Sequence, residues 1–185
     1  MALTRIGPNQ SINLASNVTG TLPSGNLPAG SILQVVQATK TDTFSTGTNT
    51  FVDVTGLTLN ITPSSSSNKI FIICDVKLGV DAGVSSVKSR IEQTISGSDT
   101  YPYIGDASGS RTRSSFGTYV NETGFMAQDA STVLLSPSTT AQITYTYQIQ
   151  EQAGGTIYVN RVEGDDDSGT IPRTASSLTA MEISA

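Results

Sequence analysis

The chain has 185 residues, enough for one domain with a buried core, and its net charge is −5 with only 14% charged residues. Its ten Lys and Arg residues are scattered, which argues against direct nucleic-acid binding because a phosphate-binding surface needs clustered positive charge. The absence of His, a single cysteine (Cys74) and the lack of any apolar run near ~20 residues exclude an intrachain disulfide, a zinc site built from Cys and His, and a membrane-spanning helix.

Residues 1–30 differ from the rest, since prolines and glycines interrupt them and their apolar residues are isolated. Such a segment forms neither a long helix nor a central strand. Two interpretations remain, a disordered leader and an extended arm that becomes ordered against neighbouring subunits. We favour the arm, whose partner-binding side chains are Ile12, Leu14, Leu22 and Leu27. The N-terminus lacks the apolar core of a secretory signal, so we expect synthesis in a host cytoplasm without export by that route.

From Ser31 onward, apolar and polar residues alternate with period two, which predicts half-buried β-strands. The fourth expected strand, residues 69–78, is apolar enough to be buried on both faces. Cys74 lies within it, and we expect a small, inert, buried side chain there. The expected strands are residues 32–38, 51–54, 57–62, 69–78, 87–95, 141–149, 156–162 and 177–183.

Residues 96–136 are the hardest part to interpret, because aromatic residues sit there among glycines and serines. We expect short strands joined by long loops. Gly-, Ser- and Pro-containing connections between strands are typical of a sandwich or barrel, and no stretch has a helical period. The sequence therefore predicts an all-β fold: an antiparallel, jelly-roll-like β-sandwich over residues 31–185, preceded by the arm of residues 1–30.

Three parts of the sequence resemble bacteriophage tail-fibre and appendage proteins. Residues 15–23 (ASNVTGTLP) are similar to a connector in many of them, and residues 57–72 are similar to the middle of their compact jelly-roll-like domains. Residues 158–161 and 173–183 are similar to their last two strands. The resemblance implies a trimeric, virion-exposed β domain with no catalytic residues to carry over. Tail fibres are usually much longer, which raises a head decoration protein or a small spike as the alternative.

The loop of residues 163–169 is the one dense acidic cluster, with three consecutive acids, Asp165, Asp166 and Asp167. Calcium prefers several carboxylate and carbonyl oxygens, but the spacing differs from that of the helix-loop-helix calcium motif. Consecutive acids also repel one another and are well solvated. We favour a solvated loop over a cation site, and we expect no cofactor.

Aromatic residues gather between positions 101 and 125, where Tyr101, Tyr103 and Tyr119 are candidate contacts to a host receptor. Exposed aromatic rings stack on sugars and anchor interfaces because they bury area at low entropic cost. The alternative role is packing in the core or between subunits, and we favour packing.

Catalysis has little support in the sequence. A serine triad lacks its histidine base, and Cys74 has no imidazole partner. A glycoside hydrolase needs two carboxylates across a cleft, yet no spacing singles out a pair. The acids considered for such a pair are Glu92, Asp99, Asp106, Glu122 and Asp129.

We therefore predict a non-enzymatic structural protein of a phage virion, a surface fibre or decoration module. Its arm attaches it to other capsid or tail proteins, and its sandwich assembles with copies of itself, most readily as a trimer. The alternative is a tail adhesion module that binds a receptor or a host surface glycan. A polysaccharide-degrading enzyme is a third hypothesis.

Overall fold

In the computed structural model, residues 27–81, 85–120 and 124–185 are described. These residues form twelve β-strands and no helix. The strands are β1 (Ile32–Lys40), β2 (Phe44–Thr46), β3 (Val52–Ile61), β4 (Lys69–Val80), β5 (Ser85–Ile95), β6 (Ser98–Thr100), β7 (Phe116–Val120), β8 (Met126–Asp129), β9 (Thr132–Leu135), β10 (Ile143–Glu151), β11 (Ile157–Val159) and β12 (Ser176–Ile183).

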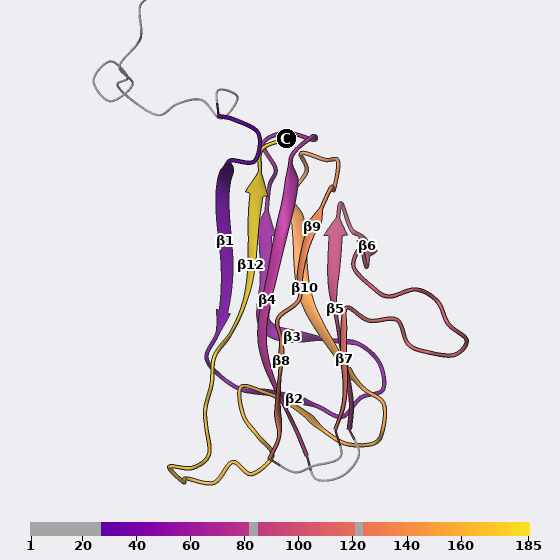
Figure 1. Ribbon diagram of the computed structural model, residues 1–185, viewed down its shortest axis with the longest axis vertical. Coiled ribbons are helices and arrows are strands. Elements are labelled where there is room, and N and C mark those ends of the chain that lie inside the picture. Colours follow the sequence, from indigo (N-terminus) through magenta and orange to yellow (C-terminus); the bar gives the residue numbers. More distant parts are fainter. Residues whose placement is uncertain (1–26, 82–84, 121–123) are drawn as a thin grey trace, which may run out of the picture.

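The strands make two antiparallel sheets that lie face to face (Figure 1). In the seven-stranded sheet, β12 and then β11 pair with one edge of β4, while β9 and then β8 pair with its other edge. β1 lies beyond β12, and β2 lies beyond β11. The five-stranded sheet has the order β3-β10-β5, with β6 and β7 along the far edge of β5. Each sheet therefore has four strand positions.

The order of these positions identifies the topology. Numbered along the chain, with β1/β2, β6/β7, β8/β9 and β11/β12 each counted as one position, the sheets follow the orders 1-8-3-6 and 2-7-4-5. This is the arrangement of a jelly roll, in which two Greek keys wrap into a sandwich. The predicted all-β, antiparallel, jelly-roll-like fold is confirmed.

The core lies between the sheets and is built by alternation along each strand. In β10, the aliphatic and aromatic side chains Ile143, Tyr145, Tyr147 and Ile149 are fully buried. They meet the inward side of β4, where Ile70, Ile72, Cys74, Val76 and Leu78 are buried. Because successive side chains in a strand point to opposite faces, one continuous core follows from the period-two pattern.

Two expected boundaries were wrong for local backbone reasons. Residues 51–54 and 57–62 form one strand, β3, in which a register shift opposite β10 accommodates Gly56 at a positive φ of 89°. The expected strand 156–162 ends at Val159, because Asn160 has a positive φ of 64° and turns the chain away. The Asn160 side chain donates hydrogen bonds to the carbonyls of Lys40 and Asp42, which fixes this turn.

The expected burial of residues 69–78 on both faces was wrong for the described part of the chain. In β4, every second side chain faces the core, but the intervening Phe71 and Ile73 are only half-buried. No described segment covers them on the outside. Although β4 is apolar enough to be buried on both faces, only its inner face is covered by described segments; its outer face, with Phe71 and Ile73, is open.

Gly79 provides a stability test of the packing at the end of the sandwich opposite the C-terminus. A Cβ atom added there would overlap the carbonyl oxygen of Arg161, whose chain segment crosses β4 at that point. Gly79→Ala is expected to lower the free energy of unfolding by about 3 kcal/mol, since the obstacle is backbone and cannot rotate away. Urea denaturation measures the effect.

The matched control is Gly117→Ala on β7, where the nearest atoms would lie 3.6 Å from the added Cβ, an ordinary contact. Equal stability of the two variants would show that the Arg161 segment does not pack against β4 as described.

Candidate assembly surface

An apolar row crosses the outer face of the seven-stranded sheet. Val35 of β1 is in register with Met181 of β12, Met181 with Phe71 of β4, and Phe71 with Leu134 of β9. Their neighbours along each strand point into the core, so these four side chains point outward. Val35 and Leu134, at the two ends, are 56% and 50% exposed. We call these four residues the apolar row.

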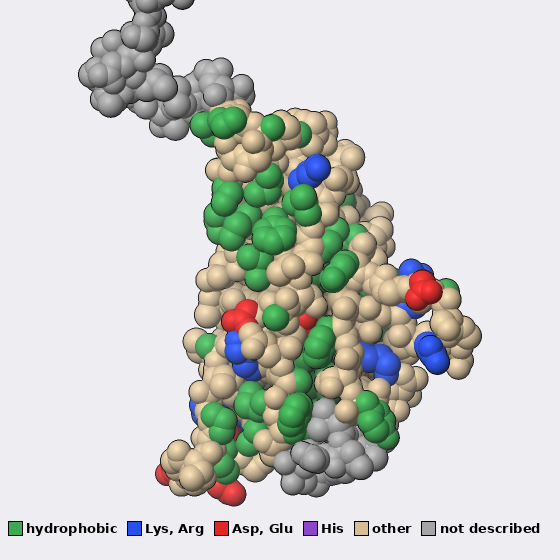
Figure 2. Space-filling view, viewed as in Figure 1, with side chains coloured by type: hydrophobic (Ala, Val, Ile, Leu, Met, Phe, Trp, Pro, Cys, Tyr) green, Lys and Arg blue, Asp and Glu red, His purple; other side chains and the backbone are tan. Residues whose placement is uncertain are grey.

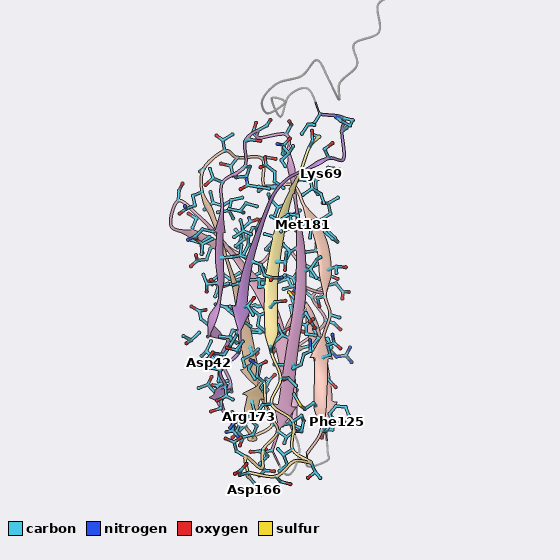
Figure 3. The ribbon with its side chains drawn as sticks, turned by 90° about the vertical axis from the view of Figure 1, so that its left-hand side faces the viewer. Asp42, Lys69, Phe125, Asp166, Arg173 and Met181 are labelled. Atoms are coloured by element: carbon cyan, nitrogen blue, oxygen red, sulfur yellow. The ribbon has the colours of Figure 1, made fainter. Side chains whose placement is uncertain are left out.

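Further apolar side chains beside the apolar row extend the apolar surface along the strands. Ile73 lies two residues from Phe71, and Ile32 and Ile183 pair at the end of the sheet where β1 begins. The charged residues Asp75 and Lys77 come further along β4 and pair with each other. Figure 2 shows hydrophobic side chains gathered over β1, β12 and β4 in the upper half of this face. Figure 3 shows Met181 there in the side view.

The outer face of the five-stranded sheet is polar instead. Its side chains hydrogen-bond to one another across the strands: Thr144 donates to Asn60 at 2.7 Å, and Gln148 donates to Asp53 at 2.7 Å and to Glu92 at 3.1 Å. An antiparallel sheet with one face in water normally shows this pattern. The two outer faces of the sandwich therefore differ in kind.

Tyr101 belongs to the polar face. The Arg90 guanidinium stacks on the Tyr101 ring at 3.5 Å and on the Phe51 ring at 4.0 Å, measured to the ring centroids. Arg90 also donates to Gln148 at 2.7 Å, and the Tyr101 hydroxyl donates to Glu92 at 3.3 Å. The stack of Phe51, Arg90 and Tyr101 is thus held in place by hydrogen bonds on two sides.

The other two predicted receptor tyrosines lie apart from this stack. Tyr103 is 36% exposed in the loop that follows β6, and its carbonyl accepts a hydrogen bond from Ser115. Tyr119 is 69% exposed on β7, at the edge of the five-stranded sheet. The three predicted receptor tyrosines, Tyr101, Tyr103 and Tyr119, thus make no described contact with one another and do not form one surface cluster.

The acidic loop lies at the end of the sandwich opposite Lys69 (Figure 3). Asp165 pairs with Arg173 at 2.5 Å, and Asp166 and Asp167 are exposed. Among the described residues, no three acidic, Cys or His side chains are grouped closely enough to hold a metal ion. Beside the loop is an open cavity of about 590 Å³, with an apolar part formed by Met126, Val162, Ile171 and Pro172.

The arm residues lie mainly outside the described part. Ile12, Leu14 and Leu22 are not among the described residues. Leu27 is half-buried and lines a cavity of about 360 Å³ together with Leu33 and the last residues of the chain. Gly30 donates its N–H to Ser184 at 2.8 Å, and Ser184 donates to Ser31 at 2.9 Å, which ties the start of β1 to the C-terminus.

The carboxylates considered for catalysis have different environments and hydrogen-bond partners. Asp129 is fully buried and accepts hydrogen bonds from Ser89, Ser131 and Tyr147, so it joins β8 to the opposite sheet. Glu92 belongs to the polar face, Asp99 accepts from Thr94, and Asp106 is in an exposed loop. Glu122 lies outside the described residues.

Cys74 is buried, as expected, and burial together with the nearby charge of Asp129 raises the pKa of its thiol. A thiol whose pKa is raised stays protonated and is a poor nucleophile. The described residues also include no helix long and apolar enough to cross a bilayer.

Comparison with known proteins assigns no family to the chain. No family model matches the chain, and no curated protein matches it. A solved chain of infectious bursal disease virus, Gx strain, is 13% identical with a TM-score of 0.36 over 82% of this chain and 36% of its own. A chain of the VP2 subviral particle of the same virus is 12% identical with a TM-score of 0.39 over 95% and 42%. This chain spans less than half the length of either.

A buried carboxylate, Glu182, locks the end of the sandwich beside the apolar row. It accepts hydrogen bonds from Asn68 at 2.6 Å, Gln34 at 2.6 Å and Ser64 at 2.6 and 2.8 Å. Burial raises the pKa of Glu182, but these hydrogen bonds outweigh that effect, so its pKa lies below the usual value.

A lowered pKa in the folded state makes stability depend on pH. Glu182 stabilises the fold above the pKa of the unfolded chain, about 4.3, and that contribution is lost as pH falls through the lower folded pKa. Glu182→Gln is expected to cost about 1–3 kcal/mol at pH 7 and to weaken the loss of stability below pH ~4.3. Urea denaturation from pH 3 to 7 measures both. If Glu182→Gln lost as much stability below pH ~4.3 as the wild type does, this role of Glu182 would be contradicted.

Proposed function

We propose that this protein is a non-enzymatic structural component of a phage virion that assembles with copies of itself through the outer face of its seven-stranded sheet. It stands on the particle surface as a fibre or decoration module. The N-terminal segment, residues 1–30, attaches it to its neighbours in the particle, which include copies of itself as well as other capsid or tail proteins.

The observation that carries the proposal is the open face of β4. Phe71 and Ile73 alternate with fully buried residues, and Val35, Met181 and Leu134 continue the apolar surface across three further strands. Large contiguous apolar surface on a soluble domain marks an interaction site, because its exposure to water is unfavourable.

The partner that we propose for the apolar row is a second copy of this chain. Soluble assemblies are mostly built from identical subunits in closed symmetry, and a trimer is the form we propose. The polar face of the five-stranded sheet then stays in water, where its Thr, Asn and Gln side chains are already satisfied by hydrogen bonds. Abundant Ser and Thr and a net charge of −5 suit a soluble exterior.

Self-assembly is tested by charging the apolar row. The double variant Val35→Lys/Leu134→Lys places two charges at the ends of the row, where desolvating them would oppose association. We expect the wild-type protein to elute as a trimer of about 58 kDa, three times 19.3 kDa. The variant is expected to associate at least tenfold more weakly. Size-exclusion chromatography with light scattering measures both masses.

The matched control is Thr58→Lys/Asn60→Lys, which adds two charges to exposed positions on the opposite face. It is expected to remain trimeric. A monomeric wild type, or a trimer that survives Val35→Lys/Leu134→Lys with its fold intact, would refute the proposal.

A second candidate function, glycan binding, is favoured by the stack of Phe51, Arg90 and Tyr101. It holds two aromatic rings beside carboxylates and an amide, the groups that contact the apolar faces and hydroxyls of sugars. Around Arg90, the carboxylates of Asp53 and Glu92 outnumber the one positive charge, so the preferred sugar is neutral rather than acidic.

This candidate predicts that Tyr101→Ala loses about fivefold or more in binding to immobilised neutral oligosaccharides, since stacking on one ring contributes about 1 kcal/mol or more. Tyr103→Ala, an exposed tyrosine outside the stack, is the matched control and is expected to bind like the wild type. Wild-type protein that binds no neutral oligosaccharide, or a Tyr101→Ala variant that binds normally, would exclude this function.

A further inference from the structure

We infer that the N-terminal segment of one copy, residues 11–22, lies on the apolar row of a neighbouring copy. This inference rests on the proposed function, in which the outer face of the seven-stranded sheet is an assembly surface, and it names what covers that face. The occupant is a second copy of this chain, and the contacting part is its N-terminal segment.

The composition of the segment fits an uncharged surface. Residues 1–26 contain Arg5 as their one charged side chain, while Ile12, Leu14, Val18 and Leu22 are apolar. Segments that remain solvated are usually rich in charge and poor in branched aliphatic residues. A stretch with this composition gains more by burying its aliphatic side chains than by staying in water.

The spacing of the apolar residues in the N-terminal segment matches the spacing of the outward-pointing residues on β4. Ile12 and Leu14 are separated by one polar residue, Asn13. In an extended chain they point to the same side, roughly 6.6 Å apart. Phe71 and Ile73 on β4 have the same separation along the sequence and both point outward. An extended segment that follows the direction of β4 therefore sets Ile12 and Leu14 against two successive rows of the sheet.

The segment is long enough to lie across the whole apolar row. The described chain begins at Leu27, and hydrogen bonds of Gly30 and Ser31 with Ser184 fix its position at the end of the sheet. Leu14 lies 13 positions before Leu27, a separation that spans up to about 43 Å when extended, at ~3.3 Å per residue. The apolar row itself crosses three interstrand spacings, about 14 Å.

The neighbouring copy, rather than the same chain, is the partner in this inference. If the segment covered the face of its own chain, each monomer would satisfy its apolar row alone, and the driving force for assembly would disappear. Exchange of segments between copies covers every row and joins the copies at the same time.

Disulfide trapping tests the inference with full-length proteins. One sample carries Leu14→Cys and the other, with a distinguishing size tag, carries Met181→Cys; they are mixed, dissociated, reassembled and oxidised. The native Cys74 is buried and does not compete. We expect a mixed disulfide between the two chains to form at least tenfold faster than with Thr58→Cys, the matched control on the polar face.

Each outcome decides the inference. A mixed disulfide specific to Met181→Cys supports it, whereas equal trapping by Met181→Cys and Thr58→Cys overturns it. A chain carrying both Leu14→Cys and Met181→Cys that forms only an internal disulfide also overturns it. If trapping fails while the wild type is trimeric and Val35→Lys/Leu134→Lys is not, the inference is wrong and the proposed function stands.

Discussion

The two outer faces of the sandwich differ in polarity, and the proposed assembly follows from that difference. A jelly roll needs only its inner faces to be apolar, and the five-stranded sheet follows that rule with Thr, Asn and Gln on its outside. The seven-stranded sheet does not, because Phe71 and Ile73 give β4 a second apolar side. Contact of that side with water is unfavourable, which supports the proposed partner on this face, whereas the polar face of the other sheet tolerates solvent.

Two buried carboxylates fix the packing of the sandwich at points that the alternation of apolar residues does not determine. Asp129 joins the sheets through Ser89 and Tyr147, and Glu182 holds the β3–β4 turn beside the apolar row. Both carboxylates are almost fully buried and are surrounded by donors, which satisfies them inside a protein interior. They stabilise the shape that presents the two outer faces, and their hydrogen-bond partners give them no free position for a substrate.

Alternation in the sequence was sufficient to predict the sandwich and most long strands, since Ile143, Tyr145, Tyr147 and Ile149 face the core as their spacing requires. It could not predict the pairing of Val35, Met181, Phe71 and Leu134, which come from four distant segments and meet only through strand register. One signal was available: residues 69–78 were too apolar for a half-exposed strand. The Arg90 stack was missed because Phe51 and Tyr101 are fifty residues apart and join only across the five-stranded sheet.

Self-assembly through the outer face of the seven-stranded sheet is tested most directly by the structure of the assembled wild-type protein, determined by electron cryo-microscopy. We expect the subunit contact to lie on the outer face of the seven-stranded sheet, with Phe71 and Met181 buried at it and Thr58 and Arg90 facing solvent. An assembly that contacts through the polar face, with Phe71 and Met181 left in water, would contradict it.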